Sequence, residues 1–347
     1  MKKHIFTSLL FLGIVASAAA QASGEKPYTD NYIYSGYLAD YKLDQATTAF
    51  SAIDDMLQAY LPEKEIPLPR ELALVSLDQL LHDTDNDGTE PFYNFINTRM
   101  LRVLKDLEKP VTKGLRIYKL YNDGFIVKSP KATVAIDLIP GGSDAKPFIA
   151  DSVIYGIAGK CDALFISHFH ADHANLNVAK SFAARGKLVI APKDLWVGVD
   201  PLIQPLEKAN EEFEVEFKEL DLTLHVLPGH QGDVYNNINV VEFHGEGTVA
   251  QTGDQWGNSA DLKWIDRVHE KYDIDVLMPN CWIDEMERVI RGFGPKLIIT
   301  GHENELGEHS IDHREAYWIT IKKMEKIEDI NIPYVLMTWG EWYDYQR

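Results

Sequence analysis

The sequence has few cysteines and a deficit of positive charge. Its two cysteines, Cys161 and Cys281, are too few for a disulfide-stapled scaffold, and neither has the spacing of a zinc-thiolate pair. Each lies beside an apolar, strand-like segment, so we expect two buried free thiols in preference to a disulfide. The chain has 34 Lys and Arg against 53 Asp and Glu, a net charge of −19. Such a chain repels polyanions, which argues against nucleic acid or an anionic membrane as its main partner.

Internal repeats, low-complexity segments and, after the first twenty residues, long apolar runs are also missing. Residues 1–20 begin with a short basic stretch, continue with the apolar run from Ile5 to Val15 and end in small residues up to Ala20. This pattern is typical of a secretory signal peptide, and its apolar run is too short to span a bilayer. We expect cleavage after Ala20 and a soluble periplasmic or secreted protein without a membrane span.

Residues 21–112 are expected to form a small helical N-terminal region. Apolar residues recur with the period of an α-helix from Leu43 to Tyr60, from about 70 to 82, and again from about 91 to 107. An apolar content of 45% is ordinary for a globular protein with a proper core.

The segment between the second and third of these helices resembles half of a calcium loop. Asp83, Asp85 and Asp87 offer oxygen ligands at positions one, three and five, and Gly88 follows at position six. Position twelve holds Asn94 where a bidentate glutamate belongs. Bound calcium therefore remains an alternative, and a solvated acidic turn that caps the third helix is favoured.

Residues 113–347 mix strands with helices, which predicts sheets covered by helices on their outer faces. The expected strands are 115–121, 124–127, 132–138, 163–166, 187–191, 222–227, 238–243, 248–251, 274–278, 296–300 and 334–337, the last of which closes the chain. The expected helices are 176–185, 260–272, 283–291 and 313–328.

The chemistry is concentrated in the stretch from His168 to His173. Three histidines and Asp172 fall within six positions, directly after the apolar run 163–166. A strand that ends in His-x-His-x-Asp-His brings nitrogen and oxygen ligands to one place. Imidazole and carboxylate together suit zinc or another first-row divalent ion. A polar loop without a metal would require this clustering by chance, with only 12 histidines in the chain.

Three further polar residues follow predicted strands, and each comes directly after a glycine. They are His230, Asp254 and His302. Glycine lets the backbone turn sharply and approach an ion closely. Ligands from the ends of separate strands are how a rigid scaffold builds a preorganised site.

In this order and at these separations, the four motifs resemble those of the metallo-β-lactamase superfamily of metal-dependent hydrolases, over residues 113–347. The resemblance implies an α/β (α+β) fold, the four-layer αββα sandwich, with its site at one edge of the two sheets. It also implies two groups of metal ligands: His168, His170 and His230 for one ion, Asp172, His173 and His302 for the other, and Asp254 as a bridge between both.

The resemblance implies two divalent ions, zinc in the first place, with manganese or iron as alternatives. A hydroxide bridging the ions would be the nucleophile, and Asp172 would be a catalytic residue that receives or orients its proton. With a bridging Asp254, the site resembles the dinuclear sites of the glyoxalase-II, lactonase and phosphodiesterase branches. The same residue disfavours β-lactam hydrolysis.

We therefore expect an exported dinuclear hydrolase that acts on a small ester, lactone or related substrate. A phosphodiesterase or other phosphoester hydrolase of the same fold is the alternative, and a non-catalytic metal-binding surface protein is the alternative from another class. Residues near the predicted ligands are expected to contact the substrate. They are Tyr235, Asn236, Asn237, Trp256 and His309.

Overall fold

The computed structural model describes residues 38–82, 89–143, 145–208, 211–306, 315–327 and 331–347. The predicted signal peptide, the acidic loop with Asp83, Asp85 and Asp87, and His309 lie outside these residues. None of the helices within the described ranges is long and apolar enough to cross a membrane.

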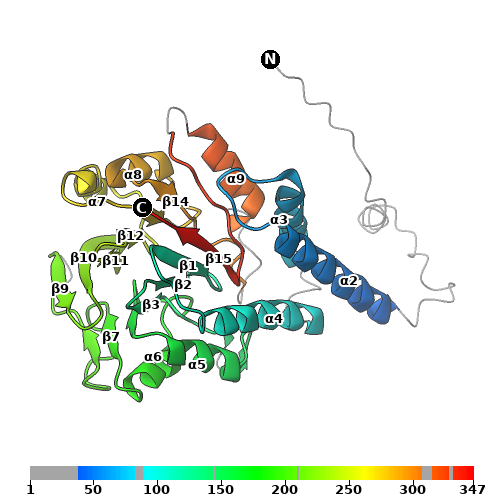
Figure 1. The fold of residues 1–347 in the computed structure, drawn as a ribbon, viewed down its shortest axis with the longest axis horizontal. Helices are drawn as coiled ribbons and strands as arrows, with labels where there is room; N and C mark the ends of the chain where they lie inside the picture. Colours follow the sequence, from blue (N-terminus) through cyan, green and yellow to red (C-terminus); the bar gives the residue numbers. More distant parts are fainter. Residues whose placement is uncertain (1–37, 83–88, 144, 209–210, 307–314, 328–330) are drawn as a thin grey trace.

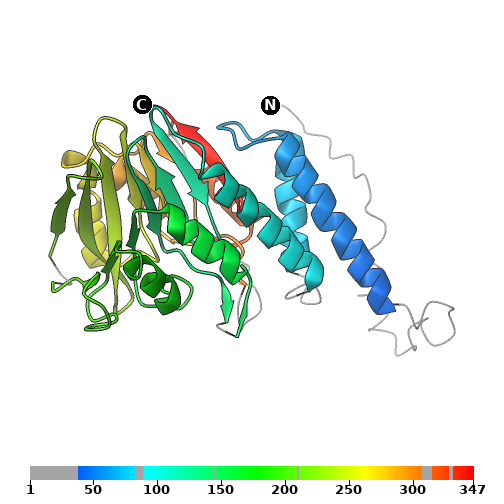
Figure 2. The same ribbon diagram turned by 60° about the horizontal axis from the view of Figure 1, so that its bottom comes forward.

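Within the described residues, three helices precede the first strand. They are α2 (Leu38–Ala59), α3 (Leu68–Leu81) and α4 (Glu90–Asp106). In Figures 1 and 2 these helices, coloured blue to cyan, extend from one side of the remaining structure. Their buried faces share one apolar cluster with Leu120, Trp339 and helix α5 (Asp151–Lys160). The N-terminal helices are therefore packed onto the rest of the fold through a common core.

The larger sheet has seven strands. In spatial order they are β15 (Glu341–Tyr345), β1 (Leu115–Lys119), β2 (Phe125–Lys128), β3 (Thr133–Ile136), β6 (Ala163–Phe165), β7 (Leu188–Ala191) and β8 (Ile203–Pro205). The pairs β15–β1, β1–β2 and β2–β3 are antiparallel, and the pairs β3–β6, β6–β7 and β7–β8 are parallel. A short hairpin, β4 (Gly142–Ser143) with β5 (Lys146–Pro147), stands apart from it.

The second sheet has six strands. In spatial order they are β14 (Leu297–Ile298), β13 (Val276–Met278), β12 (Gly247–Gln251), β11 (Val234–Phe243), β10 (Leu222–Gln231) and β9 (Phe213–Phe217). Strands β12, β13 and β14 are parallel, and β9 to β12 form an antiparallel meander.

Three apolar clusters show how the layers stack. The central cluster, which includes Ile117, Phe165, Leu224 and Met278, takes alternate residues from both sheets and fills the space between them. A second cluster packs helices α4, α5 and α6 (Leu176–Ala183) on the outer face of the larger sheet. The third packs α7 (Ser259–Ile265), η3 (Val268–Glu270) and α8 (Met286–Phe293) on the outer face of the smaller sheet. The predicted four-layer αββα sandwich is confirmed.

Several boundaries differ from the expectation. Strand β10 extends to Gln231 and strand β11 already begins at Val234. His230 and Tyr235 are therefore paired strand residues instead of loop residues. The expected closing strand 334–337 makes only a single bridge at Tyr334, and β15 closes the sheet instead. Helix α9 (Tyr317–Lys326) is shorter than expected. Both cysteines are buried and free, as predicted.

Candidate metal centre

The clustered histidines lie where strand β6 ends. The chain leaves β6 at Phe165, passes through the His168–His173 segment and enters α6, whose N-cap Asn175 accepts a hydrogen bond from the amide of Val178. Asp254 follows the end of β12, and His302 follows β14. Because these strands carry the three segments to the same edge of the sandwich, residues far apart in sequence meet there.

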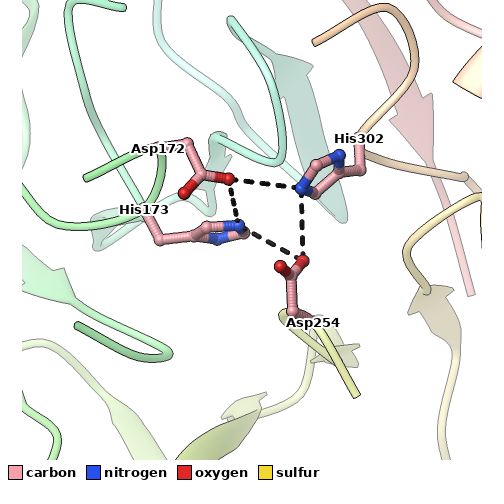
Figure 3. Close-up of side chains that lie close together, drawn as sticks. All are labelled: Asp172, His173, Asp254 and His302. Carbon is pink, nitrogen blue, oxygen red and sulfur yellow. Dashed lines mark ion pairs between the residues drawn. The ribbon is translucent and has the colours of Figure 1, made fainter. Parts of the chain in front are cut away.

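One group of ligand atoms comes from Asp172, His173, Asp254 and His302 (Figure 3). His173 Nε2 lies 3.1 Å from Asp172 Oδ2 and 3.2 Å from Asp254 Oδ1. His302 Nε2 lies 3.4 Å and 3.3 Å from the same two oxygens. The four atoms form a small ring with His173 and His302 on opposite corners.

The second group shares Asp254 with the first. It consists of His168, His170 and Asp254. His168 Nε2 lies 3.0 Å from His170 Nδ1 and 3.6 Å from Asp254 Oδ2. Since Asp254 Oδ1 faces the first group and Oδ2 faces the second, this carboxylate stands between them as a bridging ligand would.

His230 stands outside both groups of ligand atoms within the described residues. Its Nδ1 lies 3.1 Å from both carboxylate oxygens of Asp261, which fixes the ring orientation and leaves Nε2 without that partner. Metal-binding histidines are commonly held in this way by a carboxylate on the other ring nitrogen. The structure thus orients His230 like a ligand, and its predicted place in the first ion's shell stays a prediction.

The geometry fits divalent ions. Nitrogen and oxygen ligands about 2.0–2.2 Å from a zinc-sized ion lie about 3.0–3.4 Å from one another in four- to six-coordinate arrangements. The ligand-atom separations within the first group fall in this range. In addition, His173 Nε2 and Asp254 Oδ1 are buried and have no hydrogen-bond partner among the described residues. Buried polar atoms without partners are costly, and an ion between them would satisfy both.

Charge also fits. Burial raises the pKa of Asp254, but His173 and His302 outweigh it and lower that pKa to about 2. Burial lowers the pKa of His173, and Asp254 with Asp172 outweighs it and raises that pKa well above its ordinary value. Burial keeps the pKa of His168 well below its usual range, so this ring offers a lone pair. Without an ion, protons on His173 and His302 therefore neutralise the carboxylates, and a bound cation would take over that role.

A layer of buried polar groups holds the ligands from behind. Asp137 Oδ2 lies 3.0 Å from His173 Nδ1 and accepts the Ser167 hydroxyl at 2.6 Å. Gln251 Nε2 donates to Asp137 at 3.0 Å and to Asp123 at 2.6 Å. Such partners fix ring orientation and raise the basicity of the ligand. Asp137, Asp123 and Asp261 were not predicted as functional residues, because each follows or lies beside apolar sequence with no local sign of its distant partner.

Two of the residues predicted to contact substrate form hydrogen bonds to the backbone of the ligand segments. Asn236 is buried, donates to the Thr252 carbonyl at 2.7 Å and accepts the Asp254 amide at 3.1 Å. Asn237 is buried too, and its side chain donates to the Ile166 carbonyl. These amides position the ligand segments, and contact of either one with a substrate stays a prediction.

More exposed side chains border the ligands on the solvent side. Phe169 and Trp256 are about half exposed, at 56% and 48%, and the Phe169 ring lies 4.7 Å from that of His170. The Tyr235 ring lies 5.5 Å from that of His230. Lys193, which was not among the predicted substrate contacts, places Nζ 5.7 Å from the Tyr235 ring centroid. Substrate contact by Tyr235 and Trp256 stays a prediction.

Comparison with known proteins finds likeness in structure alone. No family model matches the sequence, and no curated protein matches it. The chain is similar to Igni18, a metallo hydrolase from Ignicoccus hospitalis KIN4/I, with 15% identity and a TM-score of 0.51 over 67% of this chain and 99% of that one. It is also similar to an isothiocyanate hydrolase from Delia radicum gut bacteria, with 14% identity and a TM-score of 0.49 over 67% and 99%.

A third similar structure is a proposed zinc-dependent hydrolase of the metallo-β-lactamase superfamily from Thermotoga maritima, with 16% identity and a TM-score of 0.35 over 64% and 98%. At these identities the likeness concerns the fold, and it covers about two thirds of the present chain.

Proposed function

We propose that this chain, whose fold is the αββα sandwich of metallo-β-lactamase-type metallo hydrolases, is a dinuclear metal-dependent hydrolase of a small ester, lactone or related substrate. One observation carries the proposal. The two oxygens of buried Asp254 face two different sets of histidine nitrogens. A carboxylate placed in this way can serve two ions at once, and Gln231 Nε2 donates to its Oδ2 at 2.9 Å and holds it in this orientation.

His168, His170 and His230 would hold one ion, and Asp172, His173 and His302 the other, with Asp254 shared. Two divalent ions at such a centre polarise a carbonyl or phosphoryl oxygen and lower the pKa of water toward neutrality. The ligand types accept zinc, manganese or iron.

The chain's own residues prepare the reaction in three ways. Burial of His168, His173 and Asp254 excludes bulk water from the inner side of the centre, which strengthens electrostatic interactions there. Asp172 turns one oxygen to the ligand ring and the other away from it (Figure 3), so the second oxygen is free to accept a proton from an attacking water. The apolar faces of Phe169 and Trp256 give a substrate a surface to lie on.

A phosphoester substrate is the second candidate, and Lys193 favours it. The ammonium group lies beside the Tyr235 ring, which neighbours the ring of His230, in a chain with a net charge of −19. Lys193 Nζ lies 3.8 Å from Oδ2 of the neighbouring Asp194, which is a long ion pair. A cation in this place would neutralise an anionic substrate group.

The proposal includes export, and it rests on the predicted signal peptide of residues 1–20. N-terminal sequencing of the protein from cell fractions tests it, with a start after Ala20 in the exported fraction as the expected result.

Turnover of a substrate panel tests the catalytic proposal. Purified protein loaded with zinc or manganese is assayed with 4-nitrophenyl butyrate, a homoserine lactone, a thioester and bis(4-nitrophenyl) phosphate. Hydrolysis of at least one compound, abolished by chelator and restored by metal, is the expected result. Protein that holds two ions and hydrolyses none of the four would favour the non-catalytic metal-binding alternative.

A further inference from the structure

Asn122 lies among the predicted ligands of the second ion, although neither the motifs nor the resemblance includes it. It sits in the turn between β1 and β2, and its side chain is fully buried. Its Nδ2 lies 3.0 Å from Asp172 Oδ2 and 3.3 Å from His302 Nε2. Those are two of the four atoms of the ligand ring in Figure 3. The amide thus meets the ring at the edge between Asp172 and His302.

The donor and acceptor roles in this contact depend on whether an ion is present. With no ion, the NH₂ group donates to the carboxylate oxygen Asp172 Oδ2 at 3.0 Å and to the Asp172 carbonyl at 3.3 Å. With a dication bound to Asp172 Oδ2 and His302 Nε2, the NH₂ group would present its positive end to the ion.

Hydrogen bonds to Asp172 hold the amide in its present orientation, and an ion that binds Asp172 Oδ2 removes the shorter of the two. The other end of the group, Asn122 Oδ1, is buried and has no hydrogen-bond partner among the described residues. The amide nitrogen and oxygen have nearly the same shape, so a half-turn of the group exchanges them without displacing neighbours. That turn brings Oδ1 to the position facing Asp172 Oδ2 and His302 Nε2.

The backbone also holds Asn122 beside His302. Asn122 has φ of 55°, in the left-handed region that asparagine tolerates better than most residues. Its carbonyl accepts the amide of His302 at 3.2 Å, and His302 itself has φ of 69°. Less-populated backbone conformations persist where surrounding contacts enforce them, and they cluster at functional sites.

We propose that Asn122 is a ligand of the second ion, through its amide oxygen Oδ1. The proposal rests on the dinuclear centre and adds a fifth protein ligand to Asp172, His173, Asp254 and His302. Amide oxygen is a hard donor, and with two carboxylate oxygens it makes the second site richer in oxygen than the first. Such a site suits an ion that accepts five or six ligands, such as manganese or iron, better than four-coordinate zinc.

Cobalt titration of metal-free protein tests this. Calorimetry gives the affinity of each ion, and the visible spectrum reports coordination number, because four-coordinate cobalt(II) absorbs more strongly than five- or six-coordinate cobalt(II). Asn122→Gly removes the side chain and keeps a residue that tolerates the left-handed backbone. We expect the first ion to bind as in the wild type and the second to bind roughly tenfold or more weakly, with stronger absorption.

Asn122→Asp distinguishes whether Asn122 acts as a metal ligand or as a hydrogen-bond donor. An aspartate oxygen replaces the amide oxygen as a ligand, so the second ion binds at least as tightly as in the wild type. If Asn122 merely donates to Asp172, a carboxylate 3.0 Å away repels that group, and the second ion binds more weakly.

Asn304→Gly is the matched control. Asn304 is also fully buried, has φ of 56°, and directs its amide to Asp78 instead of the ligand ring. It is expected to lose thermal stability and to keep the second ion within about threefold of the wild-type affinity.

Three results overturn the proposal: wild-type affinity in Asn122→Gly, weaker binding in Asn122→Asp, or an equal loss in Asn304→Gly. Wild-type protein that binds only one ion overturns it together with the dinuclear account. Because every readout is metal binding, a failure of the substrate panel leaves this test intact.

Discussion

Asp254 and His173 meet 3.2 Å apart, Oδ1 to Nε2, and both atoms are buried without a hydrogen-bond partner among the described residues. The other oxygen of Asp254 faces His168 across 3.6 Å. One buried carboxylate thus joins the two groups of ligand atoms. Predictions about ions, protons and the surrounding backbone follow from this arrangement.

Removal of the ions is expected to destabilise the protein. The ligand charges stay buried, and the ions that neutralised them are gone. Binding of one ion at a hundred times its dissociation constant contributes about 2.7 kcal/mol to the free energy of unfolding. Thermal unfolding with chelator and with added zinc or manganese measures this, and an unchanged midpoint would contradict a folded-state metal centre.

Affinity for metal is expected to fall with acidity. The pKa values of His173 and His302 lie well above the ordinary histidine value when no ion is bound, because the neighbouring carboxylates outweigh burial. An ion must displace these protons, so binding weakens as pH falls below the raised values. Each displaced proton costs roughly tenfold in affinity per pH unit. Calorimetry at pH 6, 7 and 8 would show a constant affinity if neither ring is a ligand.

The turn before Asp254 has no room for a side chain. Gly253 has φ of 51°, and a Cβ there would lie 2.3 Å from Asn236 Oδ1 and 2.6 Å from Ser167 Cβ. Gly253→Ala is expected to lower the free energy of unfolding by about 2–5 kcal/mol and to weaken both ions.

Gly186→Ala separates backbone strain from this crowding. Gly186 has φ of 72° and no atom within 4 Å of the added Cβ, so its cost is about 1–2 kcal/mol from the backbone alone. Urea unfolding measures both variants. Equal losses would mean that the close approach around Gly253 has no energetic consequence.

Lys193 is expected to select anionic substrates. Lys193→Met should raise KM for bis(4-nitrophenyl) phosphate roughly two- to fivefold, as expected for a partly exposed charge pair, with kcat unchanged. KM for neutral 4-nitrophenyl butyrate should stay constant. Lys180→Met, at an exposed position on α6, is the control. A similar rise in KM for both substrates would show that the Lys193 charge has no selective role.

Much of the site was accessible from sequence because its ligands are local or follow glycine. His168, His170, Asp172 and His173 occupy one short segment, and His302 follows Gly301. The fold class followed from strand and helix periodicity combined with that ligand order.

Residues that act through distant partners could not be found in this way. Asp137 contacts His173 from 36 positions away, and Asn122 contacts His302 from 180 positions away. Nothing near either residue in the sequence records that contact. Asp137 directly follows β3 and Asn122 lies in the turn after β1, and the burial that the two residues share is not visible in the sequence.

Strand ends were misjudged for a related reason. Pro228 and Gly229 look like strand breakers, yet β10 continues through them, paired with Asn237 and Asn236 of β11. Gly229 also leaves room for the Gln255 side chain against the strand. Segment 334–337 has the apolar character of a strand, but its described ladder consists of one bridge to Ile298. The mixed polar and aromatic segment Glu341–Tyr345 forms the edge strand instead.

The metal content of Asp254→Ala protein shows whether one carboxylate serves both ions. Wild-type protein and the variant are purified gently and analysed for bound ions, with exposed Asp233→Ala as the control and circular dichroism to confirm folding. The account predicts about two ions per chain in the wild type and control, and well below one in the variant, because both ions lose the shared ligand. A folded Asp254→Ala protein that keeps two ions and its activity would contradict a centre bridged by Asp254.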